Sequence, residues 1–206
     1  MKKSAASAYG ACASSYQNMS NKVHHTFESS AQLHAWLQAN HASEPELWVR
    51  IYKKGTGLPS VTWDDCVVAA LTWGWIDGVR NALDDTAFLQ RLTPRRARSG
   101  WSQKNVQHAE RLIAEGLMQA PGLAQVEAAR ADGRWASAYA GSATMEIPED
   151  FLAALQQDPA ALAFYGTLKR QQLFTIYYRL TSSKRPETRQ KRMAEILAKL
   201  GRGESL

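Results

Sequence analysis

The first half of the chain switches between the two spacings of apolar residues that strands and helices produce. Apolar side chains at every second position of residues 47–52, "LWVRIY", predict a strand. A short stretch at residues 24–27 predicts another strand before it. Between the two, Leu33, Trp36 and Leu37 share one face of a predicted helix.

Two helix starts carry the sequence signature of a capping box, in which a Ser or Thr is followed three positions later by a side chain that reaches back. Ser29 with Gln32, and Thr62 with Asp65, have this spacing. The second of these helices has an apolar face and is expected to end close to Gly74, because glycine often terminates helices.

Residues 76–83 and 86–93 are predicted to pair as a β-hairpin. Asp84 and Asp85 lie between them and suit a tight turn. Pro94 follows the second strand, and it is expected to end that strand because proline cannot donate a ladder hydrogen bond.

From residue 101 onward the spacing of apolar residues is helical. Predicted helices begin after Ser102, after Pro121, at Pro148 and at Pro186, since serine caps helices and proline favours their first turn. Residues 160–181 predict one or two more helices.

These elements predict an α+β fold, with a small antiparallel sheet and packed helices in the first half and a helical C-terminal half. We expect residues 1–20 to be a disordered N-terminal extension, because they are rich in Ala and Ser and show no period. Residues 21–140 are expected to form the α+β domain and residues 141–206 a helical region packed on it. Residues 1–18 are expected to precede the ordered protein, with Met19 as its start.

Composition narrows the class of protein only slightly. The 206 residues suffice for one good core with an appendage, and 25 Lys and Arg against 19 Asp and Glu give a net charge of +6. This charge suits an anionic ligand or simply a solvated surface. The sequence has no apolar run of membrane-spanning length, so no membrane span is expected. Cys12 and Cys66 form no Cys-x-x-Cys pair, and the natural compartment is the reducing cytoplasm.

The densest polar cluster lies in "TPRRARSGWSQKN". Arg95, Arg96 and Arg98 precede the predicted helix start at Ser102. A helix N-terminus presents N–H groups to anions, and the guanidinium fork suits phosphate or carboxylate. We therefore predict an anion site here. The alternative is a solvated loop whose arginines pair with acidic residues of the hairpin.

The stretch "LTWGWIDGVR" places two large aromatic side chains beside a glycine and a carboxylate. Asp77 is the candidate catalytic residue, because a carboxylate in such surroundings can act as a general base. It can equally cap a turn or pair with an arginine, and Arg80 follows three positions later. Trp75 and Trp101 can wall a cleft or fill a core.

Other catalytic and metal signatures are missing from the sequence. The five histidines include no His-Glu-x-x-His pattern, and no Gly-x-Ser-x-Gly elbow occurs. No metal and no cofactor are expected, and the balance leans against an enzyme.

The C-terminal helix is the other basic region. Residues 184–206 hold seven Lys or Arg and three Glu, a net of +4. Phosphate neutralisation by these residues makes nucleic-acid binding an alternative function. Aromatic residues do not interleave with the charges as a stacking platform requires, so a solvated helix face is favoured.

Several uncommon strings occur in an order that resembles the YdeI/OmpD-associated family, also called bacteriocin-protection proteins. They are "ELWVRIYKKGTGLPSVTWDDCVVAALTWGWIDG", "RLTPRRARSGWSQKN", "AERLIAEGLMQAPGL" and "KRPETRQKRMAEILAKLGRG". The resemblance covers about residues 24–203. The positions that carry its motifs are Trp75, Asp77, Gly78, Thr93, Pro94, Arg95, Trp101, Ser102 and Asn105.

The resemblance implies a role in stress response or bacteriocin protection and no particular reaction. Together with the arginine cluster it predicts a cytoplasmic binding protein for a small anionic ligand, with a protein partner as the other candidate. The expected ligand-binding residues are Trp75, Arg95, Arg96, Arg98, Trp101, Ser102 and Asn105. The first alternative is an enzyme that acts on a small anionic substrate with Asp77 as general base.

Overall fold

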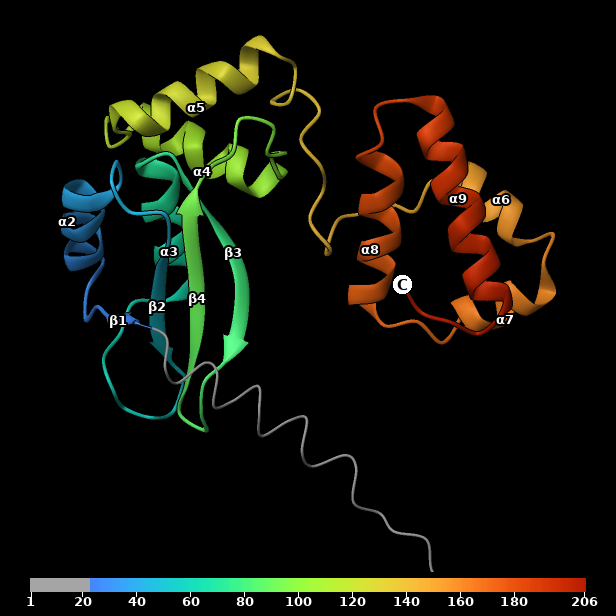
Figure 1. Ribbon diagram of the computed structural model, residues 1–206, viewed down its shortest axis with the longest axis horizontal. Helices are drawn as coiled ribbons and strands as arrows, with labels where there is room; N and C mark the ends of the chain where they lie inside the picture. Colours follow the sequence, from blue (N-terminus) through green and yellow to red (C-terminus); the bar gives the residue numbers. More distant parts are fainter. Residues whose placement is uncertain (1–22) are drawn as a thin grey trace, which may run out of the picture. The chain divides into compact units, whose positions relative to one another are not determined.

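The structure is a computed structural model, and it describes residues 23–206 (Figure 1). The expected disordered extension at residues 1–20 and the expected start at Met19 lie outside the described residues.

A four-stranded sheet forms the centre of the N-terminal part. Its strands are β1 (His25–Thr26), β2 (Leu47–Tyr52), β3 (Trp75–Ala82) and β4 (Ala87–Pro94), in the order β1-β2-β4-β3. The pairs β2–β4 and β3–β4 are antiparallel, whereas β1 runs parallel to β2. The expected antiparallel sheet is therefore wrong in this detail, and the sheet is mixed. Helix α2 (Ser30–Asn40) carries the chain back between β1 and β2, as a parallel pair requires.

The predicted helix starts are confirmed by their hydrogen bonds. The hydroxyl of Ser29 accepts from the backbone N–H of Gln32 at the start of α2. Helix α3 (Trp63–Thr72) begins with a full capping box, since Thr62 Oγ1 accepts from Asp65 N at 3.2 Å and the Asp65 carboxylate accepts from Thr62 N at 2.8 Å.

The predicted hairpin is also confirmed. β3 and β4 pair around a turn that Asp84 organises, because its Oδ1 atom accepts from the backbone N–H groups of Thr86 at 2.7 Å and Ala87 at 2.8 Å. The Thr86 hydroxyl also donates to the Asp84 carboxylate. This hydrogen bond, together with the two backbone bonds, holds the pKa of Asp84 below its usual value.

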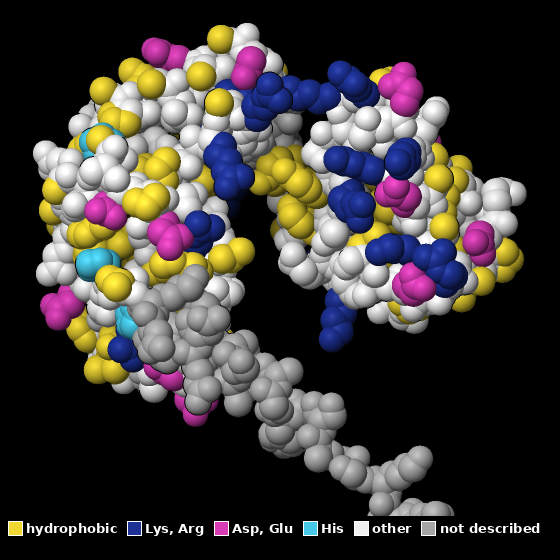
Figure 2. All heavy atoms as spheres, in the orientation of Figure 1, with side chains coloured by type: hydrophobic (Ala, Val, Ile, Leu, Met, Phe, Trp, Pro, Cys, Tyr) yellow, Lys and Arg dark blue, Asp and Glu magenta, His cyan; other side chains and the backbone are white. Residues whose placement is uncertain are grey.

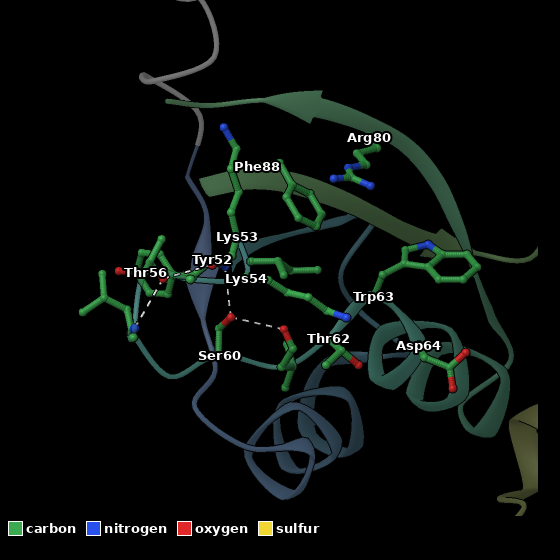
Figure 3. A pocket seen from close by; sticks show the side chains of 15 residues that line it. Tyr52, Lys53, Lys54, Thr56, Ser60, Thr62, Trp63, Asp64, Arg80 and Phe88 are labelled. Atoms are coloured by element: carbon green, nitrogen blue, oxygen red, sulfur yellow. Dashed lines mark hydrogen bonds between the residues drawn. The ribbon is translucent and has the colours of Figure 1, made fainter. Parts of the chain in front are cut away.

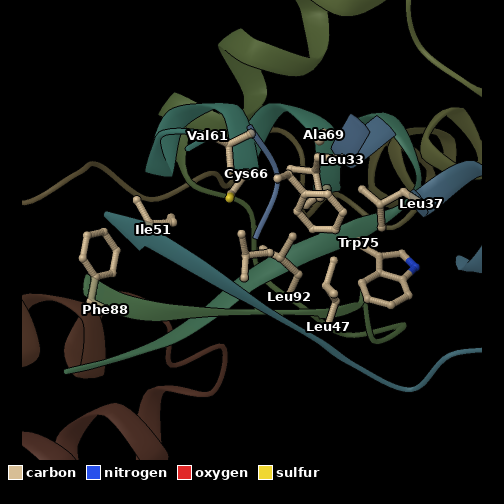
Figure 4. Close-up of a cluster of buried hydrophobic side chains, with 13 residues drawn as sticks. Leu33, Leu37, Leu47, Ile51, Val61, Cys66, Ala69, Trp75, Phe88 and Leu92 are labelled. Carbon is tan, nitrogen blue, oxygen red and sulfur yellow. The ribbon is translucent and has the colours of Figure 1, made fainter. Parts of the chain in front are cut away.

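The N-terminal core lies between one face of the sheet and helices α2 and α3 (Figure 4). Trp75 is its largest member and is 1% exposed. Its indole Nε1 donates to the backbone oxygen of His41 at 3.1 Å, and its ring meets Trp36 edge to face. Gly74 precedes it with φ of 75°, so a glycine is required where α3 gives way to β3.

Two further helices, α4 (Gln103–Ala114) and α5 (Ala120–Ala131), follow the sheet. Gly122 of α5 lies directly against the end of α3. A Cβ atom at this position would stand 2.5 Å from the backbone oxygens of Leu71 and Thr72. Only glycine permits this approach of the two helices.

The C-terminal part is helical, as predicted, with helices α6 (Glu149–Leu155), α7 (Pro159–Tyr165), α8 (Arg170–Thr181) and α9 (Pro186–Gly201). They enclose a separate core that includes Phe151 of α6, Ile176 of α8 and Ile196 of α9. The α+β class is therefore confirmed. None of the helices in residues 23–206 combines the length and the apolar character needed to cross a bilayer.

The chain divides into two compact units. One runs to Ser99 and includes Gln107–Asp132, and the other consists of Gly100–Val106 and Gly133–Leu206. The segment Gly100–Val106 belongs to the second unit because Tyr139 bonds it on both sides, donating to Trp101 O and accepting from Gln103 N, each at 2.9 Å. The boundary that we placed between residues 140 and 141 from the sequence stays a prediction.

Candidate functional site

The loop that joins β2 to α3, "KKGTGLPSV" at residues 53–61, turns back on itself. Gly55 and Gly57 have φ of 94° and 73°, a region that favours glycine. The Thr56 hydroxyl donates to Lys53 O at 3.1 Å, and Ser60 Oγ accepts from Tyr52 N at 3.0 Å. The loop is thus tied at both ends while its tip stays exposed.

A pocket of about 650 Å³ lies between this loop, the start of α3 and strands β3 and β4 (Figure 3). We call it the β2–α3 pocket. Its charged and aromatic lining residues are Tyr52, Lys53, Lys54, Trp63, Asp64, Arg80 and Phe88. Three cationic side chains thus stand against one carboxylate, and aromatic rings form part of the wall.

A β-bulge brings Arg80 to this pocket. Asp77 pairs with Leu92, but Arg80 pairs with Gln90, so β3 has one residue more than β4 in this interval. Strand side chains alternate between faces, and the extra residue places Arg80 on the same face as Asp77. There the guanidinium carbon lies 3.6 Å from the centre of the Phe88 ring. At this distance the two groups stack, which leaves the N–H groups of Arg80 directed sideways.

Gln90 holds the bulge in place. Its side chain is 1% exposed, and its Nε2 atom donates to the backbone oxygens of Gly78 at 3.0 Å and Arg91 at 3.1 Å. The orientation of an exposed arginine therefore depends on a buried amide on the next strand.

The two lysines of the loop have different surroundings. Lys53 Nζ donates to the backbone oxygens of Asp84 and Asp85, at 3.0 and 3.1 Å, and so ties the hairpin turn to β2. Lys54 points into the pocket, towards Trp63 (Figure 3). Within residues 23–206, neither Lys54 nor Arg80 forms an ion pair with a carboxylate.

Asp64 stands at the rim of the pocket, in the first turn of α3. Its carboxylate is 53% exposed and lies 3.7 Å from Nε2 of His108 on α4. Its negative charge opposes the binding of an anion on that side, so the anion-attracting part of the pocket is the end that Lys54 and Arg80 line.

The structure places the sequence-predicted residues of the first unit in different surroundings. Trp75 lies inside the core, and Asp77 is half-buried on β3, where its charge contributes to raising the pKa of Cys66. Arg95 is 6% exposed and its backbone N–H donates to Gly74 O at 3.0 Å, whereas Arg96 and Arg98 are exposed. The lining of the β2–α3 pocket includes none of Trp75, Arg95, Arg96 and Arg98.

The remaining predicted residues belong to the second unit. Trp101 is 2% exposed, and its ring centre lies 4.9 Å from that of Trp135. Ser102 caps α4, its hydroxyl accepting from the backbone N–H of Asn105 at 3.1 Å. Because Gln103 N also donates within the protein, the start of α4 uses these N–H groups internally.

Cys66 is a core residue. It is fully buried, and burial raises the pKa of its thiol to about 12, with the charges of Asp65 and Asp77 adding to the effect. A thiol with this pKa is a poor nucleophile at neutral pH. Among residues 23–206, no three His, Cys, Asp or Glu side chains gather as a metal site would require.

Sequence reasoning singled out Arg80 only as a neighbour of Asp77, and it missed Lys54 and Trp63. The dipeptide Lys53-Lys54 before a glycine was the available signal. A loop that folds back over a strand is invisible to periodicity, and so is the bulge that turns Arg80.

Comparisons with known proteins match two separate parts of the chain. Residues 144–203 match the family model described as Bacteriocin-protection, YdeI or OmpD-Associated, and residues 25–125 match a domain of unknown function, DUF8412. No curated protein and no solved structure matches the chain. The resemblance was expected over residues 24–203, but the family match is shorter, and motif positions such as Trp75 and Asp77 fall in the other domain. Through residues 144–203, the chain carries a domain of the bacteriocin-protection, YdeI or OmpD-associated family, which confirms the resemblance read from its sequence over this stretch alone.

Proposed function

We propose that the protein is a binding protein that holds a small anionic ligand in the β2–α3 pocket, and that it serves in bacteriocin protection or a related stress response. The observation that carries this proposal is the presence of Lys54 and Arg80 in one pocket, neither of them ion-paired within residues 23–206. The match of residues 144–203 to the bacteriocin-protection, YdeI or OmpD-associated family supports the proposed role in protection or stress response.

Electrostatics favours an anion there. Two cations that line the same pocket repel one another, and an anion between them relieves that repulsion while it gains two charge-assisted hydrogen bonds. The pocket of about 650 Å³ has the size of a small-molecule site. A pocket of this kind needs no catalytic group, and Asp77, the candidate base, is not among the residues that line it.

The arginine cluster remains a second candidate place for the same ligand. Arg96 and Arg98 are exposed in the turn before α4 and present two guanidinium groups. Arg95 is buried, and the first N–H groups of α4 bond within the protein, so this place offers fewer donors than the sequence suggested.

Nucleic-acid binding through α9 has weaker support. Arg189 pairs with Asp150, and Arg192 donates to the backbone oxygen of Arg179 at 2.9 Å. On the face shown in Figure 2, Lys and Arg of the C-terminal unit lie beside Asp and Glu. The carboxylate of Asp150 neutralises Arg189, and Arg192 is engaged within the protein, so fewer cations of α9 are available to phosphates and weak retention on DNA at low salt is expected.

A cytoplasmic location is part of the proposal. The thiol of Cys66 is free and buried, and a binding protein with a free thiol fits a reducing compartment. Cell fractionation with a tagged chain tests this, and recovery from the periplasmic fraction would contradict it.

The test of the pocket is thermal unfolding with a panel of carboxylates, phosphorylated sugars and nucleotides. A ligand at a hundred times its Kd stabilises the folded state by about 2.7 kcal/mol. We expect an anion to raise the Tm of the wild type and of the Arg96→Gln/Arg98→Gln control, but not of Lys54→Gln/Arg80→Gln. The control removes the same number of charges from an exposed loop. Loss of the shift in the control alone would move the site to the arginine cluster, and no shift with any anion would refute the proposal.

A further inference from the structure

We infer that the ligand of the β2–α3 pocket is a flat ring system joined to one anionic group, with the ring against Trp63 and the anion between Lys54 and Arg80. This inference rests on the proposed function and adds the chemical class of the ligand. The anionic group is a carboxylate or a phosphate, since both suit a lysine and an arginine.

Trp63 supplies the surface for the ring. It is the first residue of α3 and is held there by the capping box of Thr62, yet 39% of it is exposed. Figure 3 shows its indole at the side of the pocket beyond the end of Lys54. A large ring left accessible at a fixed place in a pocket gains by covering its face with another ring, in an offset or edge-to-face contact.

Arg80 is placed to contact both the ring and the anionic group of the ligand. One face of its guanidinium is covered by Phe88, at 3.6 Å. The opposite face remains a flat cationic surface, on which an aromatic ring stacks, while the N–H groups at its edge bind the anion. A ligand whose ring and anion are adjacent satisfies both features of this one side chain.

Two other classes of anion fit the pocket less well. A flexible acyl chain with a carboxylate would cover Trp63 without using the flat faces of the indole and the guanidinium. An acidic segment of a protein partner would need a longer groove, whereas the loop at residues 53–61 closes the pocket on one side (Figure 3). A compact ring with an attached anion matches both the walls and the volume.

Calorimetric titration with matched probes tests the inference. For a phosphate source the probes are AMP, ribose 5-phosphate, which lacks the base, and adenosine, which lacks the charge. For a carboxylate source they are 2-naphthoate, cyclohexanecarboxylate and 2-naphthamide. We expect one ringed anion to bind at least tenfold more tightly than both its ringless and its uncharged counterparts.

Two variants of Trp63 separate stacking from folding. Trp63→Leu should lose the tenfold preference for the ring and keep the affinity for the ringless anion, whereas Trp63→Phe should retain most of the preference. Unchanged thermal unfolding of both variants shows that they fold. Equal binding of ringed and ringless anions, or a preference that survives in Trp63→Leu, would overturn the inference and leave the proposed function standing. Binding of no anion at all would overturn both.

Discussion

Replacing Gln90 by leucine should weaken both the fold and the anion pocket, because this buried amide connects the two. Leucine has nearly the volume of glutamine, so the change removes hydrogen bonds without opening a cavity. The Gln90 side chain is 1% exposed and donates to the backbone oxygens of Gly78 and Arg91 at 3.0 and 3.1 Å. Both bonds brace the bulge that turns Arg80 towards Phe88.

The size of the loss follows from these two bonds. Each contributes about 1 kcal/mol net to stability, which gives about 2 kcal/mol for the two together. Gly78 is exposed, so water can replace the donor on its oxygen, whereas Arg91 is half-buried. We therefore expect the free energy of unfolding to fall by about 1–2 kcal/mol. The anion should also bind more weakly, because Arg80 loses its fixed orientation.

Urea unfolding measures the first effect and calorimetric titration of the bound anion the second. Gln107→Leu is the matched control, since Gln107 is exposed on α4 and its replacement should change stability by less than about 0.5 kcal/mol. If Gln90→Leu unfolds like the control and binds the anion like the wild type, the bulge does not depend on this amide and the reasoning fails.

Three more predictions concern parts of the molecule away from the pocket. Gly122→Ala should destabilise the protein by about 1–3 kcal/mol, because the new methyl group would overlap the end of α3, whereas Gly141→Ala, which meets open space, should change little; equal urea midpoints would contradict this. In a variant that retains Cys66 as its only cysteine, the native protein should react with a thiol reagent at pH 8 far more slowly than the unfolded protein, because burial raises the pKa of this thiol to about 12; rapid native reaction would show the thiol to be accessible. Asp150→Asn should lower stability at pH 7 by at most about 1 kcal/mol, since the carboxylate is half-exposed. The hydrogen bond from Arg189 holds the pKa of Asp150 below its unfolded value, so the difference from the wild type should be complete above about pH 4, shrink as the pH falls further and vanish only below the lowered pKa of the folded state; a difference that stays constant from pH 7 to pH 2 would contradict the assignment.

Local chemistry was enough to predict most elements of the fold. Ser29 and Thr62 were recognised as helix caps because the capping box depends on residues three positions apart. The hairpin turn was recognised for the same reason, since the Asp84 carboxylate bonds to residues two and three positions later. Interactions of this range are visible in the sequence.

Pairing between distant segments was not predictable in the same way. β1 has only two residues, and nothing in its composition states that it lies parallel to β2. The bulge in β3 is equally hidden, although it decides which face Arg80 occupies. If the side chains of β3 alternated without a bulge, Arg80 would lie on the other face of the sheet from Asp77, away from the pocket.

The sequence and the structure favour different places for the anion site, for a related reason. Arginines in sequence proximity suggested one anion site, but Arg95 is buried while Arg96 and Arg98 are exposed. Lys54 and Arg80 lie 26 positions apart in the sequence and line one pocket because the loop at residues 53–61 folds back over the sheet. Such a site forms only through tertiary structure.

Hydrogen–deuterium exchange with and without a saturating anion is the most direct test of the central claim, because it locates the ligand without altering the protein. The exposed tip of the loop, around Lys54 to Gly57, has few backbone hydrogen bonds and should exchange quickly in the free protein. We predict that the bound anion slows exchange in residues 53–62 and leaves residues 95–105 unchanged. Protection of residues 95–105 alone, by an anion that raises the Tm, would contradict the account and return the site to the arginine cluster.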